Sequence, residues 1–375
     1  MTTTLRRLTN APSRLALGAY VPARTAAWPE ASRLFVVGDG RGWSIDDDRA
    51  RLTATAHRLG CEVAPTAWAR HARRQSVFSH DHFGALQPRW LESSHRLGLS
   101  YFHGRPGTPG MPEFDACFST LRRRHGDIDR VQVTNAAMEG LVLETGLAPE
   151  KVHRIPIGVD AEAFAMRTPG RAEAARRVLD VPSSAFVVGS FQKDGVGWGD
   201  GLEPKLIKGP DVLLAVVERL RERVPELLVL LTGPARGYVR AGLERLGVPH
   251  RHVLLPGVDA VAQAYDAIDL CLVTSRDEGG PRAVLESMAT GVPLVSTRVG
   301  QGADLVRHGE NGWLAAVEGV EELVHWSAHV AGAAESDLSR VRAAARETAE
   351  ANSYPALVPR WEELLRGFVD LPQRA

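Results

Sequence analysis

The sequence predicts an α/β protein made of two domains, each built on a parallel sheet. Strand-like apolar runs alternate with helical patterns between residues 33 and 300, which is typical of strand–helix–strand units with parallel strands. The alternation restarts near residue 185, after a polar segment at 165–184, and this indicates a second domain. At 375 residues with 44% apolar side chains, the chain is long enough to form two cores.

The apolar runs of strand length fall into two series. Those of the first half lie at 34–37, 62–64, 76–79, 99–103, 131–134 and 152–155. Those of the second half lie at 185–190, 227–232, 252–255, 270–274 and 293–297. The last segment instead predicts a helix, because its apolar residues recur at helical spacing: Leu357, Trp361, Leu364, Leu365 and Phe368.

These series set the expected domain boundaries. We expect a Rossmann-like domain at 1–160, a linker at 161–184, a second Rossmann-like domain at 185–354 and a terminal helical segment at 355–375. The linker is predicted from its polar composition and from the turn-forming residues that precede it.

The bulk composition argues against several classes of protein. The formal net charge is zero, which disfavours a nucleic-acid binder that relies on phosphate attraction. The three cysteines cannot all pair within one chain and lack the spacing of metal ligands, so we expect a reducing, cytoplasmic location. No stretch has the length of a membrane span, and the N-terminus lacks the apolar segment of a signal peptide. Peripheral contact with a membrane stays open.

The strongest functional signal is the nonapeptide Glu278-Gly279-Gly280-Pro281-Arg282-Ala283-Val284-Leu285-Glu286. It lies between the apolar run 270–274 and a short helical segment that ends at Gly291, so its two carboxylates flank a strand-to-helix turn. Adjacent glycines let the backbone approach a ligand, and free amides at a helix start favour an anion such as phosphate. Because a carboxylate repels phosphate, we expect each Glu to bind neutral hydroxyls beside the anion. An anion between two polyols describes a nucleotide sugar.

The lysines form a second signal. Of 45 basic residues only four are Lys, and three of these lie between positions 193 and 208. Where Arg is the default cation, a retained Lys indicates a need for a compact point charge, as in phosphate binding. A surface loop of drifting composition is the alternative interpretation.

The nonapeptide resembles the Glu-x7-Glu signature of the retaining GT-B glycosyltransferases of glycosyltransferase family 4, also called glycosyl transferases group 1. The double glycine, the preceding strand and the following segment 291–297 are part of that resemblance. Segments 152–160, 299–306 and 310–314 resemble further motifs of the family, with Ile157 at a position where the family has Asn. The resemblance covers the chain almost completely from about residue 130 and is much thinner before it.

This resemblance implies the fold and a division of labour. In the GT-B fold, two Rossmann-like domains face each other across a cleft, and a C-terminal helix crosses back to the first domain. The first domain would bind the acceptor, and the second would bind a nucleotide diphosphate sugar as the donor substrate. The family's transfer retains the configuration of the sugar and needs neither a metal ion nor another cofactor.

On the donor side, the resemblance assigns the stabilisation of the leaving diphosphate to two cations, an Arg after a strand glycine and a Lys before a later glycine. Lys208 fits the Lys position, but the Arg position after Gly189 is occupied by Ser190. We expect Lys193 to supply the missing cation, because it lies nearest the strand end, with Lys205 as the alternative.

Within the nonapeptide, the resemblance implies that Glu278 contacts hydroxyls of the donor sugar and that Glu286 contacts the ribose. For Glu286, a solvated helix face is the alternative. Arg282 either touches phosphate or covers the surface. Gly279 and Gly280 complete the predicted donor-binding set.

Three histidines are expected near the acceptor. His103 lies at the C-terminal end of a predicted strand, where α/β sheets bind ligands, and it resembles the family's strand-end His near the transfer centre. We therefore predict that His103 and Glu278 are catalytic, and that His103 either donates a hydrogen bond to the donor sugar or orients the acceptor. His80 and His82 follow the strand at 76–79. Two His separated by one residue could bind a metal ion, but this spacing alone is weak evidence for a metal site. Contact with donor or acceptor and a purely structural role both stay open for this pair.

The glycine-rich loop after the first strand is also assigned to the acceptor side. Its third glycine comes one residue early for Gly-x-Gly-x-x-Gly, and Asp39 would oppose a pyrophosphate, so we reject a dinucleotide site. We expect Gly38 and Gly40 to approach the substrate and Trp43 to stack on a sugar ring. The acidic run 46–48 opens a helix, where carboxylates complement the helix dipole, and we predict no metal site there.

The sequence thus predicts a metal-independent, retaining glycosyltransferase that moves a sugar from a nucleotide diphosphate sugar to a hydroxyl of a small natural product or glycan. Two alternatives stay open. A GT-B nucleotide-sugar epimerase would need no acceptor, and a catalytically silent nucleotide-sugar-binding subunit is suggested by the departure at Ser190. No nucleic-acid partner is expected.

Overall fold

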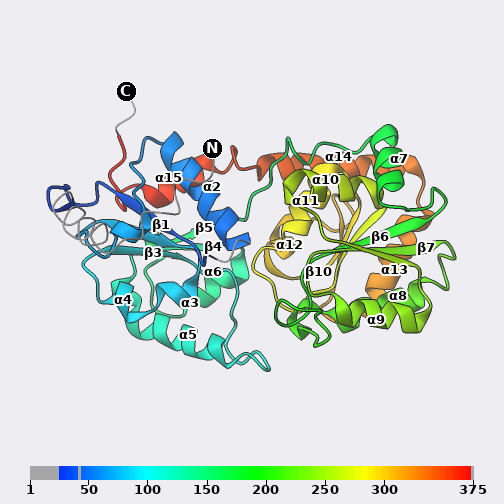
Figure 1. Ribbon diagram of the computed structural model, residues 1–375, viewed down its shortest axis with the longest axis horizontal. Helices are drawn as coiled ribbons and strands as arrows, with labels where there is room; N and C mark the ends of the chain where they lie inside the picture. Colours follow the sequence, from blue (N-terminus) through cyan, green and yellow to red (C-terminus); the bar gives the residue numbers. More distant parts are fainter. Residues whose placement is uncertain (1–24, 41–43, 373–375) are drawn as a thin grey trace, which may run out of the picture. The chain divides into compact units, whose positions relative to one another are not determined.

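The computed structural model describes residues 25–40 and 44–372 of the chain (Figure 1). The chain forms two compact units. The first comprises Met1–Val133, Glu139–Ile155 and Val358–Ala375, and the second comprises Thr134–Met138 and Pro156–Leu357. The helical segment that follows residue 357 is therefore part of the first unit.

The first unit is built on a parallel sheet in the order β1-β2-β3-β4-β5. Its strands are β1 (Leu34–Val37), β2 (Ser76–Ser79), β3 (Arg96–Ser100), β4 (Arg130–Val133) and β5 (Val152–Arg154). The register pairs Leu34 with Ser76, Ser76 with Arg96, and Gly98 with Arg130. Because neighbours in sequence are neighbours in this sheet, the chain advances across it in one direction.

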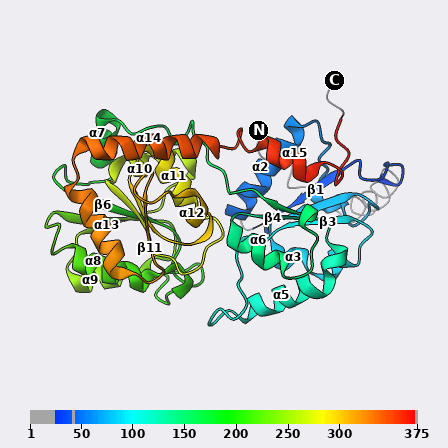
Figure 2. The ribbon, with the colours of Figure 1, turned by 180° about the vertical axis from the view of Figure 1, so that it is seen from behind.

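Helices cover both faces of this sheet. They are α2 (Ser44–Arg58), α3 (His82–Ala85), α4 (Pro88–Leu91), α5 (Pro112–Arg124), α6 (Ala136–Leu143) and α15 (Val358–Leu365). Helices α2 and α15 lie on one face, and α3 and α5 lie on the other (Figures 1 and 2). The last turn of α15 is tied to the sheet, because Arg130 Nε, on β4, donates to the carbonyl of Leu364 at 2.9 Å.

The second unit is built on a parallel sheet in the order β11-β10-β9-β6-β7-β8. Its strands are β6 (Phe186–Phe191), β7 (Leu227–Thr232), β8 (His250–Val253), β9 (Leu270–Val273), β10 (Leu294–Thr297) and β11 (Trp313–Ala315). Its helices are α7 (Pro169–Val178), α8 (Pro210–Leu220), α9 (Gly237–Leu246), α10 (Gly257–Ala267), α11 (Arg282–Thr290), α12 (Gly300–Leu305), α13 (Val320–Gly332) and α14 (Glu335–Ala351). Short 3₁₀ helices occur at Thr66–Trp68, His125–Asp127, Pro149–Lys151 and, as η4, Leu206–Lys208.

The second unit has a core on each side of its sheet. Helices α7, α10, α11 and α14 cover one face, and α8, α9 and α13 cover the other (Figures 1 and 2). Successive residues of a strand point to opposite faces, so Leu230 and Cys271 join the first core while Leu231 and Leu272 join the second. Both faces are buried, which explains why these strands are continuously apolar in the sequence.

The predicted fold class, α/β with parallel sheets, is confirmed. The structure differs from the prediction in several places, and three of them concern whole elements. The run 62–64 contributes only an isolated bridge between Leu34 and Val63. The expected linker 161–184 contains α7, which packs on α10 and buries only Ala172 and Ala175, so it lacks the large apolar side chains that mark a helix in sequence. Strand β11 was not predicted.

Candidate functional site

The sheet of the second unit has a topological switch point between β6 and β9. From β6 the chain moves outward to β7 and β8 on one side, and from β9 it moves outward to β10 and β11 on the other. In open parallel sheets, ligands bind at such a point, outside the carboxyl ends of the strands, because the two following loops diverge there. The loop after β6 ends in η4, and the loop after β9 leads to α11. The predicted donor-side residues lie on β6, these loops and α11.

Lys208 and Glu278 meet at this edge of the sheet. Lys208 Nζ lies 2.5 Å from Glu278 Oε2, and Ser275 Oγ donates to the other carboxylate oxygen at 3.0 Å. Glu278 is only 8% exposed, so its charge needs this cation and this hydroxyl as partners. The structure thus brings together two predicted residues that are 70 positions apart in sequence.

Gly209 fixes the position of Lys208. Its φ of 63° is left-handed, and a Cβ built on it would lie 1.9 Å from the carbonyl oxygen of Thr274. Thr274 Oγ1 in turn donates to the carbonyl of Gly209 at 2.9 Å. The start of α8 therefore lies directly against the end of β9, which only glycine permits.

Two side chains that the sequence analysis missed connect the same loops. Gln192 Nε2 donates to the carbonyl of Lys208 at 3.0 Å. Thr297 Oγ1, at the end of β10, donates to the carbonyl of Ser275 at 2.7 Å. The carboxyl ends of β6, β9 and β10 are thereby joined by side-chain hydrogen bonds around the Lys208–Glu278 pair.

The double glycine is held by protein groups. The carbonyl of Gly279 accepts hydrogen bonds from Thr134 Oγ1 at 2.6 Å, Asn135 Nδ2 at 3.0 Å and the amide of Gln301 at 3.0 Å. A Cβ at Gly280 would lie 2.8 Å from both Gln301 Oε1 and Ile157 Cδ1. A side chain at position 280 would therefore clash with Gln301 and Ile157.

Glu286 lies on α11 and contacts Tyr265. The phenol of Tyr265 donates to Glu286 Oε2 at 3.0 Å, so this carboxylate is not a solvated helix-face residue. Burial raises the pKa of Glu286, and the charge of Arg282 and the Tyr265 hydrogen bond oppose that rise. Arg282 Nη1 donates to the phenol of Tyr354 at 3.2 Å.

Ser190 and Lys193 lie at the end of β6 and just after it. Ser190 is 1% exposed, and its Oγ accepts a hydrogen bond from Arg236 Nη2 at 3.0 Å. Lys193 Nζ lies 4.8 Å from the centre of the Trp198 ring. Burial, and then the charge of Lys208, lower the pKa of Lys193, so the two ammonium groups are near enough to repel. Lys205 contributes its amide to the carbonyl of Asp194 at 2.7 Å.

The predicted histidines all lie in the first unit. His80 is 2% exposed, and its Nδ1 lies 2.9 Å from Ser100 Oγ, which donates to Gln132. His82 is buried at the start of α3, with its ring centre 5.6 Å from that of His103. Burial lowers the pKa of His82 to about 4. His103 is half-buried in the segment after β3, which ends at Ser100 and not at residue 103 as predicted.

The loop after β1 is closed by a carboxylate. A Cβ on Gly38 would lie 2.3 Å from Asp46 Oδ1, and the amide of Gly40 donates to the same oxygen at 3.3 Å. Gly38 therefore accommodates Asp46. Trp43 lies outside the described residues.

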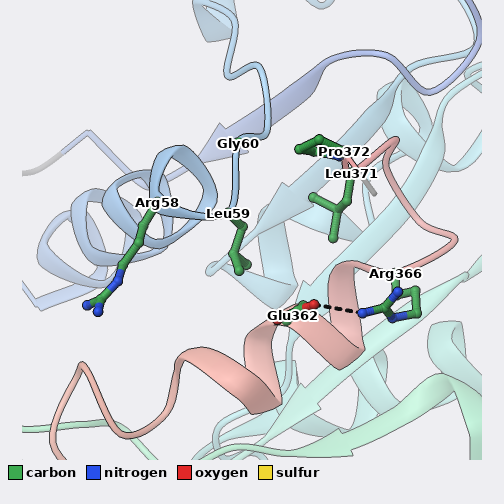
Figure 3. Close-up of a pocket in the computed structure, with 7 residues that line it drawn as sticks. All are labelled: Arg58, Leu59, Gly60, Glu362, Arg366, Leu371 and Pro372. Carbon is green, nitrogen blue, oxygen red and sulfur yellow. Dashed lines mark hydrogen bonds and ion pairs between the residues drawn. The ribbon is translucent and has the colours of Figure 1, made fainter. Parts of the chain in front are cut away.

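A cavity of about 670 Å³ also lies in the first unit (Figure 3). It is lined by Arg58, Leu59, Gly60, Glu362, Arg366, Leu371 and Pro372. Glu362 pairs with Arg366 at 2.6 Å along α15, and none of the predicted site residues lines the cavity. The cavity therefore lies where the C-terminal segment packs against residues 58–60.

Neither a metal cluster nor a membrane helix occurs in the described part of the chain. Residues 25–40 and 44–372 contain no group of three or more His, Cys, Asp or Glu side chains arranged to hold a metal ion. None of the helices in the same residues combines the length and the apolar character needed to cross a bilayer.

Comparison with known proteins finds a similarity in part of the second unit. Residues 201–330, which run from the loop before η4 through α13, match the family model described as glycosyl transferases group 1. This region is similar to the glycosyl transferases group 1 family. The match includes Lys208, Glu278 and Glu286, so the predicted resemblance is confirmed.

The chain is also similar to curated proteins named D-inositol 3-phosphate glycosyltransferase. The chain is 33% identical over 197 residues to a D-inositol 3-phosphate glycosyltransferase of Stackebrandtia nassauensis, covering 48% of this chain and 42% of that protein. It is 29% identical over 258 residues to the enzyme of the same name from Corynebacterium urealyticum, covering 64% and 56%. The chain thus spans about half the length of the curated relatives it matches.

Solved structures share the fold of the whole chain. Anabaena Alr3699/HepE in complex with UDP and glucose matches with a TM-score of 0.71 at 16% identity, covering 90% of this chain and all of that one. A sucrose-phosphate synthase from Thermosynechococcus elongatus matches with a TM-score of 0.65 at 15% identity, covering 96% and 93%. The predicted GT-B fold class is thereby confirmed.

Proposed function

We propose that this protein is a retaining glycosyltransferase that transfers a sugar from a nucleotide diphosphate sugar to an acceptor hydroxyl without a metal ion. The observation that carries the proposal is the Lys208–Glu278 pair at the switch point of the second sheet. A cation beside a buried carboxylate suits a ligand that presents an anion next to hydroxyl groups. The match of residues 201–330 to the family model supports the same ligand class.

Donor binding would exchange the partners within this pair. The diphosphate would replace Glu278 as the partner of Lys208, and the freed carboxylate oxygen would accept a hydrogen bond from a hydroxyl of the donor sugar. Ser275 would keep the carboxylate in place through its bond to Oε1. The ion pair therefore keeps both charges compensated until the donor arrives.

In the transfer step, the bond between the anomeric carbon and the phosphate oxygen breaks, and a bond to the acceptor oxygen forms on the same face. The acceptor proton passes to the leaving phosphate oxygen, so no enzyme carboxylate acts as nucleophile. Lys208 and Lys193 would stabilise the negative charge that develops on the diphosphate. Their combined charge is what we expect to take the place of a metal ion.

The remaining predicted residues take supporting roles. Glu286 would bind the ribose, with Tyr265 holding its Oε2. Arg282 and the double glycine would complete the donor site. On the acceptor side we assign the direct role to the half-buried His103, because His80 and His82 are almost completely buried.

UDP-sugars are the first donors to test, since structures of Anabaena Alr3699/HepE hold UDP and UDP-glucose. D-inositol 3-phosphate is the first acceptor, since it is named in the curated relatives. A thermal-shift screen with UDP-glucose, UDP-N-acetylglucosamine and GDP-mannose is followed by transfer assays, with the anomeric configuration of the product read by NMR.

Stabilisation by a nucleotide sugar and a product of retained configuration are expected. An inverted product would refute the retaining mechanism, and a requirement for Mg²⁺ after treatment with chelator would refute metal independence. Binding without transfer or hydrolysis would instead indicate the silent subunit, and a changed sugar without an acceptor would indicate an epimerase.

A further inference from the structure

Arg236 is a completely buried cation in the loop between β7 and α9. It is 1% exposed, and its Nη1 donates to three carbonyl oxygens, those of Ser190 at 2.6 Å, Thr232 at 2.8 Å and Gln192 at 2.9 Å. Its Nη2 donates to Ser190 Oγ, and its Nε lies 2.9 Å from Asp194 Oδ1. Neither side chain of this ion pair has any exposed surface.

These contacts converge on one short segment. Apart from the bond to Thr232, every contact of the guanidinium falls on residues 190–194. Removing a guanidinium from water is costly, and the planar fork of five donors recovers that cost only when its acceptors are held in the right places. The end of β6 and the three residues after it therefore have a geometry that Arg236 defines.

The same segment leads directly into the proposed donor site. The carbonyl of Gln192 is held by Arg236, while the side chain of Gln192 donates to the carbonyl of Lys208. Lys193 lies between the two residues that Arg236 holds on either side, Gln192 and Asp194. Arg236 is thus connected to both lysines of the proposed donor site, to Lys193 through its two chain neighbours and to Lys208 through the side chain of Gln192.

The rest of the long loop is docked onto the residues around Arg236. A Cβ on Gly195 would lie 2.3 Å from the carbonyl oxygen of Ala235, and one on Gly201 would lie 2.2 Å from the same oxygen. The amide of Gly237 donates to the carbonyl of Asp200 at 2.6 Å. The base of the loop is therefore clamped to the segment that carries Arg236.

The charge of Arg236 is compensated within the protein, unlike the charges of the lysines that would meet the ligand. Asp194 compensates Arg236, so the buried pair adds no net charge to the site. Lys193 is partly buried and feels the charge of Lys208, and both effects lower its pKa, so an incoming anion would be favoured beside it. The buried pair organises the site. Lys193, and Lys208 once the donor has displaced Glu278, would supply the positive charge that meets the anion.

We propose that Arg236 is a positioning residue of the donor site, which holds segment 190–194 so that Lys193 and Lys208 meet the same diphosphate. This inference rests on the proposed function. It also accounts for Ser190, at the position where the resemblance implies an Arg. At this strand end the guanidinium belongs to Arg236, which is buried and contacts Ser190 instead of a ligand. Lys193 would then be the residue that contacts the anion.

A double-mutant cycle tests the coupling. UDP-glucose affinity is measured by calorimetry for the wild type, Arg236→Gln, Lys193→Ala and the double variant, with circular dichroism and Tm recorded for each. We expect Arg236→Gln to weaken binding at least 10-fold in the wild-type background and less than 3-fold in the Lys193→Ala background. Equal losses in both backgrounds would overturn the inference. If Arg236→Gln does not fold, Arg236→Lys enters the same cycle, because it keeps the charge and loses the fork.

Arg346 provides the matched control. It also donates to three carbonyls, those of Phe164, Ala289 and Ala161, and none of its hydrogen bonds within the described part of the chain falls on residues 190–208. Arg346→Gln is expected to lower Tm and to change UDP-glucose affinity less than 2-fold. A loss of affinity equal to that of Arg236→Gln would show a general effect of lost stability and refute positioning. Failure of the wild type to bind UDP-glucose, UDP-N-acetylglucosamine and GDP-mannose would refute the proposed function itself, and this inference with it.

Discussion

Lys208 Nζ lies 2.5 Å from Glu278 Oε2 and joins the end of the loop after β6 to the loop after β9. The two side chains are 22% and 9% exposed, so the pair is shielded but open enough for a ligand to reach it. A ligand that binds here has to displace one charge with another. We therefore expect substitutions of Glu278 and of Lys208 to have different effects.

Glu278→Gln removes the charge and keeps the shape of the side chain. We expect kcat/KM for sugar transfer to fall roughly 10- to 100-fold, because a hydrogen bond from a sugar hydroxyl to a carboxylate is lost. Initial rates with a saturating acceptor measure it. The exposed Glu310, which pairs with Arg307, supplies the control variant Glu310→Gln, expected to transfer at the wild-type rate. Equal rates for the two variants would refute the role of Glu278.

Lys208→Met should act on donor binding. We expect the affinity for UDP-glucose to fall roughly 10- to 100-fold, since a charge-assisted contact to phosphate is removed. Calorimetry with UDP-glucose measures this loss. The variant should lose affinity for UDP by a similar factor, because Lys208 is expected to contact the diphosphate and not the sugar. If UDP binding were unchanged, Lys208 would have to contact the sugar or only support Glu278.

Gly209→Ala should destabilise the protein far more than an ordinary glycine substitution. The new Cβ would enter left-handed backbone and meet the carbonyl of Thr274 at 1.9 Å, at a cost of about 3 kcal/mol or more. Gly247 is the matched control, because it has nearly the same φ, 64°, with nothing within 4 Å of its Cβ position. Gly247→Ala should cost only about 1 kcal/mol. Chemical denaturation compares the two, and equal losses would mean that the start of α8 shifts to relieve the clash.

The strands that the sequence predicted best are those whose apolar runs are buried on both faces. Runs 34–37, 76–79 and 227–232 coincide with β1, β2 and β7. Strand β3 was misplaced because it contains Gly98, which reads as a breaker. In the structure a Cβ at Gly98 would lie 2.5 Å from Phe78, so this glycine makes room for an aromatic ring in the core. Strand β11 has only three residues, too few for a period to emerge.

In the candidate site, too, the sequence predicted some features and only the structure shows the others. Lys208 and Glu278 were predicted separately from motifs, but their direct contact depends on the order of the strands and on the left-handed Gly209. Arg236 was not predicted, since in a chain with 45 basic residues of which four are Lys, one more Arg carries no signal. Only the fold shows that this Arg is buried against Asp194.

His82 should make the stability of the protein depend on pH. Burial lowers its pKa from an ordinary 6.5 to about 4, and its Nε2 has no hydrogen-bond partner among the described residues. Between these values the unfolded chain binds a proton that the folded chain does not, so the free energy of unfolding falls as the pH falls from 6.5 to 4. Above pH 6.5 both states are neutral and the full stability is present. The difference corresponds to about 3 kcal/mol.

His82→Phe should flatten this dependence, because Phe keeps a ring among Phe83, Tyr101 and His103 and carries no titrating group. Urea denaturation at pH 7.5 and pH 5 measures the change in each protein. The variant should lose less stability than the wild type over this interval, and His57→Gln, on the exposed face of α2, should lose as much as the wild type. If His82→Phe declined as steeply as the wild type, the buried imidazole would not be the group that titrates, and the carboxylates would have to account for the slope.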